Sequence, residues 1–238
     1  MKAVVLAGGK GTRLAPYTTV LPKPLVPVGG IPILETVLRQ LRHHGFREVV
    51  LAVGYLSPLI RAYFDNNPIT NKLWLRYHQE QAPLGTAGAI ASIDDLDDSF
   101  LAMNGDLLTT LDYAAMMRFH RERGAALTVA VTERQLQVEV GVLQINSEDR
   151  IVGYDEKPTH RFQASMGIYV FSPRVREVMK PGVALDIPGL VLRLLEAGER
   201  VIGFRSDAFW LDMGNPADYE RASEAFERNR KLFLPDEA

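Results

Sequence analysis

The sequence predicts an α/β protein of three layers, in which a mixed, mostly parallel central sheet lies between helices and an antiparallel annex follows. Three observations predict this class. Strand-like and helix-like segments alternate through the first half of the 238 residues, as in parallel βαβ units. After about residue 138 the alternation gives way to short strand-like runs joined by a turn. The composition, 47% hydrophobic and 24% charged, is that of an ordinary globular protein.

The first half begins with an apolar strand at the N-terminus. The spacing of Ile33, Val37 and Leu41 places them on one face of a helix, and Ser57-Pro58 is a typical helix start. In order, we expect strand Lys2–Ala7, helix Ile33–Leu41, strand Glu48–Val53, helix Ser57–Phe64, strand Leu73–Tyr77, helix Ala87–Ile93, strand Phe100–Met103, helix Leu111–Arg121 and strand Leu127–Val131.

The second half is predicted to be more antiparallel. Asp186 is expected to cap a helix on its N-terminal side, and Gly198 to close that helix. Pro216 begins a last amphipathic helix through Tyr219, Ala222 and Phe226. In order, we expect a hairpin of Gly141–Ile145 and Arg150–Tyr154, strand Met166–Phe171, helix Asp186–Leu195, strand Val201–Phe204 and the helix that begins at Pro216.

Composition narrows the classes of function. The chain has no cysteine, so disulfides, thiol catalysis and zinc–thiolate sites are excluded. A net charge of -2 argues against a general nucleic-acid-binding protein. The N-terminus enters a strand without a basic-then-apolar leader, and no apolar run approaches membrane-spanning length. We therefore expect a cytoplasmic protein with no nucleic-acid or membrane partner.

The segment Leu6–Leu25, LAGGKGTRLAPYTTVLPKPL, is rich in glycine and proline. A P-loop needs Ser or Thr where Gly11 stands, and the dinucleotide fingerprint needs Gly or Ala where Leu14 stands. An ordinary surface loop does not explain Arg13 and Lys23 on a proline-stiffened segment. Glycine amides, a guanidinium and an ammonium suit a triphosphate. The amides and Arg13 would neutralise the polyphosphate, and Lys23 would meet a second anionic group.

The run LAGGKGTRLAPYTTVLPKPLVPVGGIPIL resembles the signature loop of the sugar-1-phosphate nucleotidyltransferases, the nucleotide-sugar pyrophosphorylases. The likeness continues in the family's order through EQAPLGTAGAI, NGD, DEKP, MGIYVFSP and FWLDMGNPADY, over almost the whole chain. It departs at Ala15, where Arg is common, and at Tyr17, where Leu is frequent. The resemblance implies a Rossmann-like α/β/α fold in one catalytic domain, residues 1–238, with no C-terminal β-helix domain. Residues 1–137 would mainly bind nucleotide, and residues 138–238 mainly sugar phosphate.

The reaction implied by the resemblance is attack of a sugar 1-phosphate oxygen on the α-phosphorus of a nucleoside triphosphate, with release of pyrophosphate. Because the nucleophile is already an anion, alignment and charge neutralisation matter more than a strong base. The implied catalytic residues are Arg13, Lys23, Asp106 and Asp212. The two aspartates would bind Mg²⁺, which often takes one or two carboxylates together with substrate phosphates. Taken alone, each aspartate would be a surface or capping residue.

The nucleotide site implied by the resemblance combines the glycine loop with a base-contacting loop around Glu80. Guanylyl-transferring members commonly carry Glu-x-x-Pro-Leu-Gly-Thr-Ala-Gly, as this chain does, whereas thymidylyl-transferring members tend to have Gln at the position of Glu80. Guanine is therefore favoured. The implied nucleotide-binding residues are Leu6, Ala7, Gly8, Gly9, Gly11, Thr12, Arg13, Glu80, Gly85 and Thr86.

The sugar-phosphate site is expected in the second half. By composition alone, the segment 155–158 is a charged turn, but the resemblance implies that Lys157 binds the sugar's phosphate and Glu156 accepts hydrogen bonds from ring hydroxyls. Many mannose-specific relatives have Asn-Ala-Gly where this chain has Ser165-Met166-Gly167. The implied sugar-phosphate-binding residues are Lys23, Gly141, Glu156, Lys157 and Ser165.

The motifs are closest to those of mannose-1-phosphate guanylyltransferases, so GTP and mannose 1-phosphate or a related sugar phosphate are the favoured substrates. Uridylyl or thymidylyl transfer to another sugar 1-phosphate is an alternative, as are a nucleotide-sugar-binding module and transfer to an alcohol phosphate. A catalytically silent regulatory homologue would be expected to lose Arg13, Lys23, Asp106 or Asp212, and all four are retained. A homodimer is compatible with the sequence.

Overall fold

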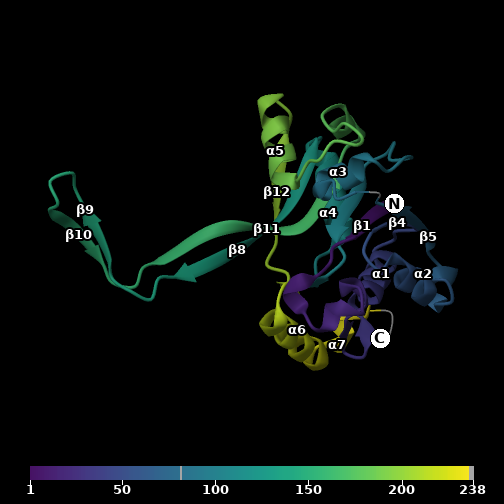
Figure 1. Ribbon diagram of the computed structural model, residues 1–238. Helices are drawn as coiled ribbons and strands as arrows, with labels where there is room; N and C mark the ends of the chain where they lie inside the picture. Colours follow the sequence, from purple (N-terminus) through teal and green to yellow (C-terminus); the bar gives the residue numbers. More distant parts are fainter. Residues whose placement is uncertain (81, 236–238) are drawn as a thin grey trace.

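The computed structural model describes residues 1–80 and 82–235. Its centre is a seven-stranded sheet in the order β12-β8-β11-β6-β1-β4-β5 (Figure 1). All neighbouring pairs are parallel except those of β11, which is antiparallel to β6 and β8. This mixed, mostly parallel sheet confirms the predicted fold class. The strands are β1 (Lys2–Ala7), β4 (Glu48–Val53), β5 (Trp74–Gln79), β6 (Phe100–Asn104), β8 (Leu127–Gln137), β11 (Thr159–Phe171) and β12 (Val201–Arg205).

Helices cover both faces of this sheet. Alternate residues of β1 enter different cores: Ala3 and Val5 face one layer of helices, and Val4 faces the other, as the two-residue period of a strand requires. The first layer consists of α1 (Ile33–His43), α2 (Ser57–Phe64) and α4 (Tyr113–Arg123). The second consists of α3 (Gly85–Ala91) and α5 (Ile187–Glu196).

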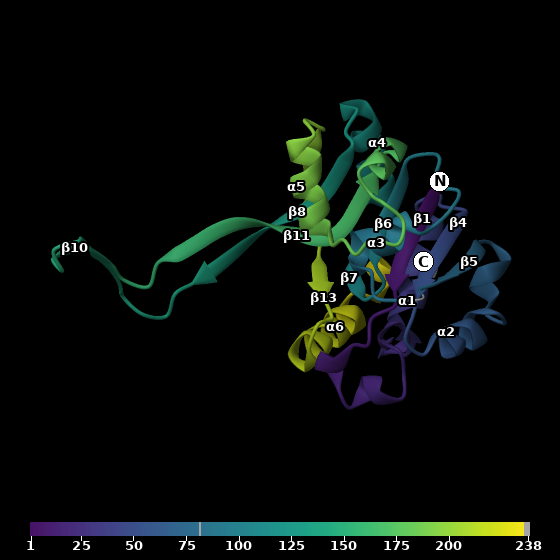
Figure 2. The ribbon, with the colours of Figure 1, turned by 45° about the horizontal axis from the view of Figure 1, so that its top comes forward.

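A third, smaller core joins the C-terminal segment to the N-terminal half (Figure 2). Strand β13 (Trp210–Asp212) pairs antiparallel with β7 (Leu107–Thr109), and β2 (Pro27–Val28) pairs with β3 (Ile31–Pro32). Helices α6 (Pro216–Arg228) and α7 (Arg230–Phe233) pack Phe226 and Phe233 against Leu108 and Leu211. The short strands were not predicted, because two or three residues carry no periodicity. Among the described residues, no helix has the length and apolarity needed to cross a bilayer.

Side-chain caps set several helix boundaries. Asp186 accepts a hydrogen bond from the Gly189 amide at 2.8 Å, which confirms the predicted cap of α5. Asp112 caps α4 by accepting from Ala115 N at 2.8 Å. The prediction that this helix starts at Leu111 was therefore wrong, since Leu111 precedes the cap and is buried in the first core.

Strands β8 and β11 are longer than predicted, and their outer parts form a two-stranded ribbon that projects from the body (Figures 1 and 2). The ladder runs without a register shift from Val131–Ser165 to Gln137–Thr159. No pattern in the sequence predicts this extension, because the ribbon buries neither face and its polar and apolar side chains do not alternate. At its tip, β9 (Val142–Ile145) and β10 (Ile151–Asp155) form the predicted hairpin.

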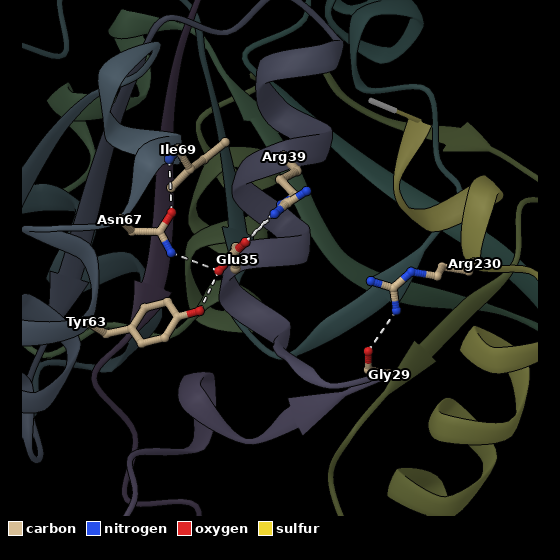
Figure 3. Close-up of polar contacts among 7 residues, drawn as sticks. All are labelled: Gly29, Glu35, Arg39, Tyr63, Asn67, Ile69 and Arg230. Carbon is tan, nitrogen blue, oxygen red and sulfur yellow. Dashed lines mark hydrogen bonds and ion pairs between the residues drawn. The ribbon is translucent and has the colours of Figure 1, made fainter. Parts of the chain in front are cut away.

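A buried carboxylate connects α1 to α2 and to the segment that follows α2 (Figure 3). Glu35 Oε1 accepts hydrogen bonds from Arg39 Nε at 2.9 Å and Nη2 at 2.6 Å, and Oε2 accepts from Tyr63 OH at 2.5 Å and Asn67 Nδ2 at 2.9 Å. Burial opposes ionisation, but the hydrogen bonds from Tyr63, Arg39 and Asn67 outweigh it and lower the pKa of Glu35. Figure 3 also shows Arg230, which donates to the carbonyl of Gly29 at 2.8 Å and ties α7 to the β2–β3 turn.

Candidate functional site

The carboxyl ends of four neighbouring parallel strands form one edge of the sheet, where ligands of open α/β sheets bind. Gly8 follows β1, Gly54 follows β4, Glu80 follows β5 and Gly105 follows β6. A cavity of about 680 Å³ opens there, a size suited to a small-molecule ligand. Its lining includes these residues predicted from the sequence: Leu6, Gly8, Gly9, Glu80, Gly85, Thr86 and Asp106.

Two glycines allow the loops after β1 and β4 to approach each other. A Cβ on Gly8 would lie 2.7 Å from Glu80 Oε1, and a Cβ on Gly54 would lie 2.8 Å from the carbonyl oxygen of Gly8. Burial raises the pKa of the Glu80 carboxyl. The wall of the cavity at this point is therefore made of backbone beside the Glu80 carboxylate, and the close backbone contact leaves no room for a larger residue at position 54.

Gly85 fixes the start of α3 against the segment before α5. Its φ of +73° suits glycine, and a Cβ there would lie 2.7 Å from the Leu185 carbonyl oxygen. Gly88 N donates to that oxygen at 2.9 Å, and Leu185 N donates to Leu84 O at 2.8 Å. Gly85 thus lines the cavity and also permits the close approach of two backbone segments.

The glycine loop folds back so that Arg13 and Lys23 face the same edge. Gly11 adopts φ +62°, its carbonyl accepts a hydrogen bond from Thr18 Oγ1 at 2.7 Å, and a Cβ there would lie 3.0 Å from Lys23 Cβ. Arg13 lies in a 3-10 turn, Thr12–Leu14, and Lys23 begins another, Lys23–Leu25. The Arg13 guanidinium packs against the backbone at Gly214, directly after β13.

Two carboxylates from opposite halves of the chain meet at Lys23. Its Nζ donates to Asp106 Oδ2 and lies 3.8 Å from Asp212 Oδ1. Burial raises the pKa of Asp212, the charge of Asp106 adds to the rise, and Lys23 and Arg13 oppose it. Asp212 Oδ1 is buried, and no hydrogen-bond donor within the described ranges, 1–80 and 82–235, reaches it. The structure thus brings all four predicted catalytic residues together.

The remaining predicted residues lie elsewhere. Ala7 is buried in the first core. Ser165 lies at the root of the ribbon, where its Oγ is 3.3 Å from Tyr169 OH and accepts from Gly167 N at 3.3 Å. Three others lie at the ribbon's far end, away from the body, and within this chain they do not join the cavity: Gly141, Glu156 and Lys157. Their roles in sugar binding stay predictions.

Several cavity residues were missed by the sequence reasoning: Lys10, Tyr55 and Asn104 line the cavity, as does Gly54. A signal existed for Gly54, because it ends an apolar strand just as Gly8 does. Trp210 is only partly buried against the first core, and its Nε1 donates to Met166 O at 2.7 Å, which holds the root of the ribbon beside β13.

The chain resembles proteins of known activity over most of its length. It is 34% identical to a mannose-1-phosphate guanylyltransferase of Mycobacterium tuberculosis, with 93% of this chain and 63% of that protein covered. It is 31% identical to a UTP–glucose-1-phosphate uridylyltransferase of Synechocystis, with 93% and 62% covered. The chain therefore spans about three fifths of the length of these curated relatives.

A solved structure shares the architecture. HddC from Yersinia pseudotuberculosis, crystallised in complex with GMP-PN, superposes with a TM-score of 0.72 at 26% identity, covering 94% of this chain and 99% of that one. The family model described as nucleotidyl transferase matches residues 2–229. With the glycine loop, the cavity at the carboxyl edge and the paired aspartates in place, this match shows that the chain belongs to the nucleotidyl transferase family.

Proposed function

We propose that this protein transfers a nucleotidyl group from a nucleoside triphosphate to a sugar 1-phosphate and releases pyrophosphate, with GTP and mannose 1-phosphate or a related sugar phosphate as the favoured pair. One observation carries the proposal. Lys23, Asp106 and Asp212 meet beside the glycine-loop cavity although they lie far apart in the sequence. Such a cluster places a lysine beside two carboxylates that suit a divalent cation, and the lysine and that cation together would neutralise charge where two phosphates approach each other.

The aspartate pair suits Mg²⁺. Mg²⁺ prefers carboxylate oxygens and often takes only one or two from the protein. The buried Asp212 Oδ1 without a hydrogen-bond donor is an acceptor of that kind. Within residues 1–80 and 82–235 there is no cluster of three or more His, Cys, Asp or Glu that could hold a metal without substrate, so substrate phosphates would complete the coordination. When bound, the ion would neutralise the α-phosphate and orient it for in-line attack.

The chain's own groups have separate tasks in this proposal. Backbone amides of the glycine loop would bind the β- and γ-phosphates, and Arg13 would neutralise the charge that develops on the leaving pyrophosphate. Lys23 would hold the attacking phosphate of the sugar against the α-phosphorus. Asp106 and Asp212, besides binding the metal ion, would hold the side chains of Lys23 and Arg13 in position.

Glu80 supports the preference for guanine. Its carboxylate lies in the cavity wall and can accept hydrogen bonds from two donors on one edge of a base. Guanine presents an N–H and an amino group side by side, whereas uracil and thymine present a single N–H. Since the relatives include a uridylyltransferase, uridylyl transfer is the second candidate.

A panel of four nucleoside triphosphates against several hexose 1-phosphates, with Mg²⁺ and assayed by pyrophosphate release, tests the proposal. We expect the highest kcat/KM for GTP with mannose 1-phosphate. A maximum for UTP with glucose 1-phosphate would favour the second candidate. No release with any pair, together with no nucleotide binding by calorimetry, would refute the proposed function.

Two variants test the assignment of roles. Asp106→Asn and Lys157→Ala are each expected to lower turnover by a factor of at least about 100 and to leave the circular dichroism spectrum unchanged. Asp98→Asn, a carboxylate exposed on the loop before β6, is the matched control and should keep full activity. Normal turnover in Asp106→Asn would contradict the role given to that residue.

A further inference from the structure

The ribbon and its hairpin tip, residues 132–165, form an arm that finds little support in its own chain. The arm consists of the outer halves of β8 and β11 and the β9–β10 hairpin, which pair only with each other in the described structure. None of its residues is buried, and 27 of its 34 residues are exposed. Figures 1 and 2 both show it extending away from the sheet. An isolated two-stranded hairpin is marginally stable in water, so such an arm needs a surface to pack against.

The tip presents an apolar face. Tyr154 lies opposite Leu143, and Ile151 lies opposite Ile145. Directly opposed residues point to the same side of a hairpin, as do residues two apart on one strand, so Leu143, Ile145 and Tyr154 share one face. Ile151 lies opposite Ile145 at a register shift between Ile151 and Gly153, and all four side chains are exposed. Exposed apolar clusters of this kind mark surfaces that bind another protein.

The backbone at the tip has a specific, strained conformation. Lys157 adopts φ +47° just before Pro158, a conformation that residues other than glycine adopt rarely. Tyr154 OH donates to Glu156 Oε2 at 3.0 Å, and a Cβ on Gly141 would lie 2.2 Å from that hydroxyl oxygen. The charged turn therefore has a defined shape although no other part of its chain supports it.

The arm cannot bring this turn to its own site while the ribbon stays paired. Six residue steps separate the Val131–Ser165 pair from the Gln137–Thr159 pair, which holds the tip roughly 20 Å beyond the sheet at about 3.4 Å per step. The root of the arm, however, lies at the rim of the site: Met166 O accepts from Trp210 Nε1, and Gly167 packs against Asn104.

We propose that the arm crosses to a second copy of this chain, and that each arm completes the active site of the other with Glu156 and Lys157. This inference rests on the proposed function, because it assigns those two residues to the sugar-phosphate half of the partner's site. A two-fold arrangement accommodates both arms with one set of contacts and closes the assembly. The 27 exposed residues of the arm match the roughly 20–30 residues that one side of a standard interface contains.

Sedimentation velocity tests the assembly independently of activity. The wild-type protein should sediment as a dimer. Ile145→Asp, on the apolar face of the tip and 59% exposed, should shift it to monomer. Leu192→Asp, on α5 and 61% exposed, is the matched control and should stay dimeric. A wild-type monomer at micromolar concentration would overturn the proposal, as would a dimer that Ile145→Asp leaves intact.

Complementation tests whether the arm acts in the partner's site. Asp106→Asn and Lys157→Ala are co-expressed with different tags and purified, each alone and mixed. In a crossed dimer, one of the two sites of each mixed dimer combines an intact body with an intact arm. Because about half of the dimers in a statistical mixture are mixed, about a quarter of wild-type activity should return. If each arm serves its own body, every site carries a defect and no activity returns, which would overturn the proposal. If the wild type releases no pyrophosphate, the proposed function is refuted, and sedimentation velocity still shows whether the arms join two chains into a dimer.

Discussion

Glu35→Gln tests the most heavily bonded buried carboxylate of the structure. The Glu35 side chain is 5% exposed and accepts four hydrogen bonds from Arg39, Tyr63 and Asn67. A glutamine keeps one acceptor oxygen and turns an amino group toward two of these donors. Removing one partner of a buried ion pair costs about 3–5 kcal/mol. Because Arg39 is 24% exposed, water can solvate part of its charge, and we expect a loss of about 2–4 kcal/mol.

Urea unfolding and calorimetry measure this loss. For a protein of this size, each kcal/mol lowers Tm by about 2–4 °C, so a decrease of about 4–16 °C is expected. The control is Glu224→Gln, whose carboxylate pairs with Arg228 at 3.2 Å with both side chains largely exposed. Surface pairs of this kind contribute little, so Tm should not change. If Glu35→Gln behaves like its control, the reasoning is refuted.

The pH dependence of stability provides a second test of the Glu35→Gln variant. The folded-state pKa of Glu35 is lowered from its ordinary value of 4.5. Its contribution to stability is therefore complete above pH 4.5 and is lost as the pH falls through the lower pKa of the folded state. The difference in stability between wild type and Glu35→Gln should narrow below pH 4.5. A constant difference would mean that the carboxylate's charge is not what stabilises the fold.

Three further predictions concern the site. Gly85→Ala should weaken nucleotide binding in calorimetry and lower Tm, because the new Cβ would meet the Leu185 carbonyl. The control is Gly182→Ala, which has the same left-handed backbone (φ +76°) but open space around it. This control should lower Tm less and leave nucleotide binding unchanged. Lys23→Met removes a cation that opposes the rise in the pKa of Asp212, so the acid limb of the kcat/KM–pH profile should move to higher pH. If the acid limb does not move, the ionisation of Asp212 does not control the rate. Removal of divalent ions with EDTA should abolish pyrophosphate release, and Asp212→Asn should raise the Mg²⁺ concentration needed to restore it.

The local sequence by itself determined the elements that bury an apolar face or end at a strong cap. Strands β1 and β4 were predicted with their observed bounds because each is a continuous apolar run. Helix α5 was predicted from its stripe and from the cap at Asp186. The resemblance in the glycine loop and the later motifs predicted the four charged residues that meet in the cluster, because these motifs follow the family's order and spacing along the chain; their catalytic roles stay predictions.

Tertiary structure decided what depends on contacts between distant segments. The meeting of Asp106 and Asp212 at Lys23 requires β13 to pair with β7, and strands of three residues leave no periodic trace in the sequence. The network around Glu35 was missed because a glutamate on a helix is usually solvated. The length of β8 and β11 beyond the sheet was missed because these outer strand segments are exposed. An exposed ribbon needs no alternation of polar and apolar residues, so only the pairing of the two strands across the fold reveals the arm.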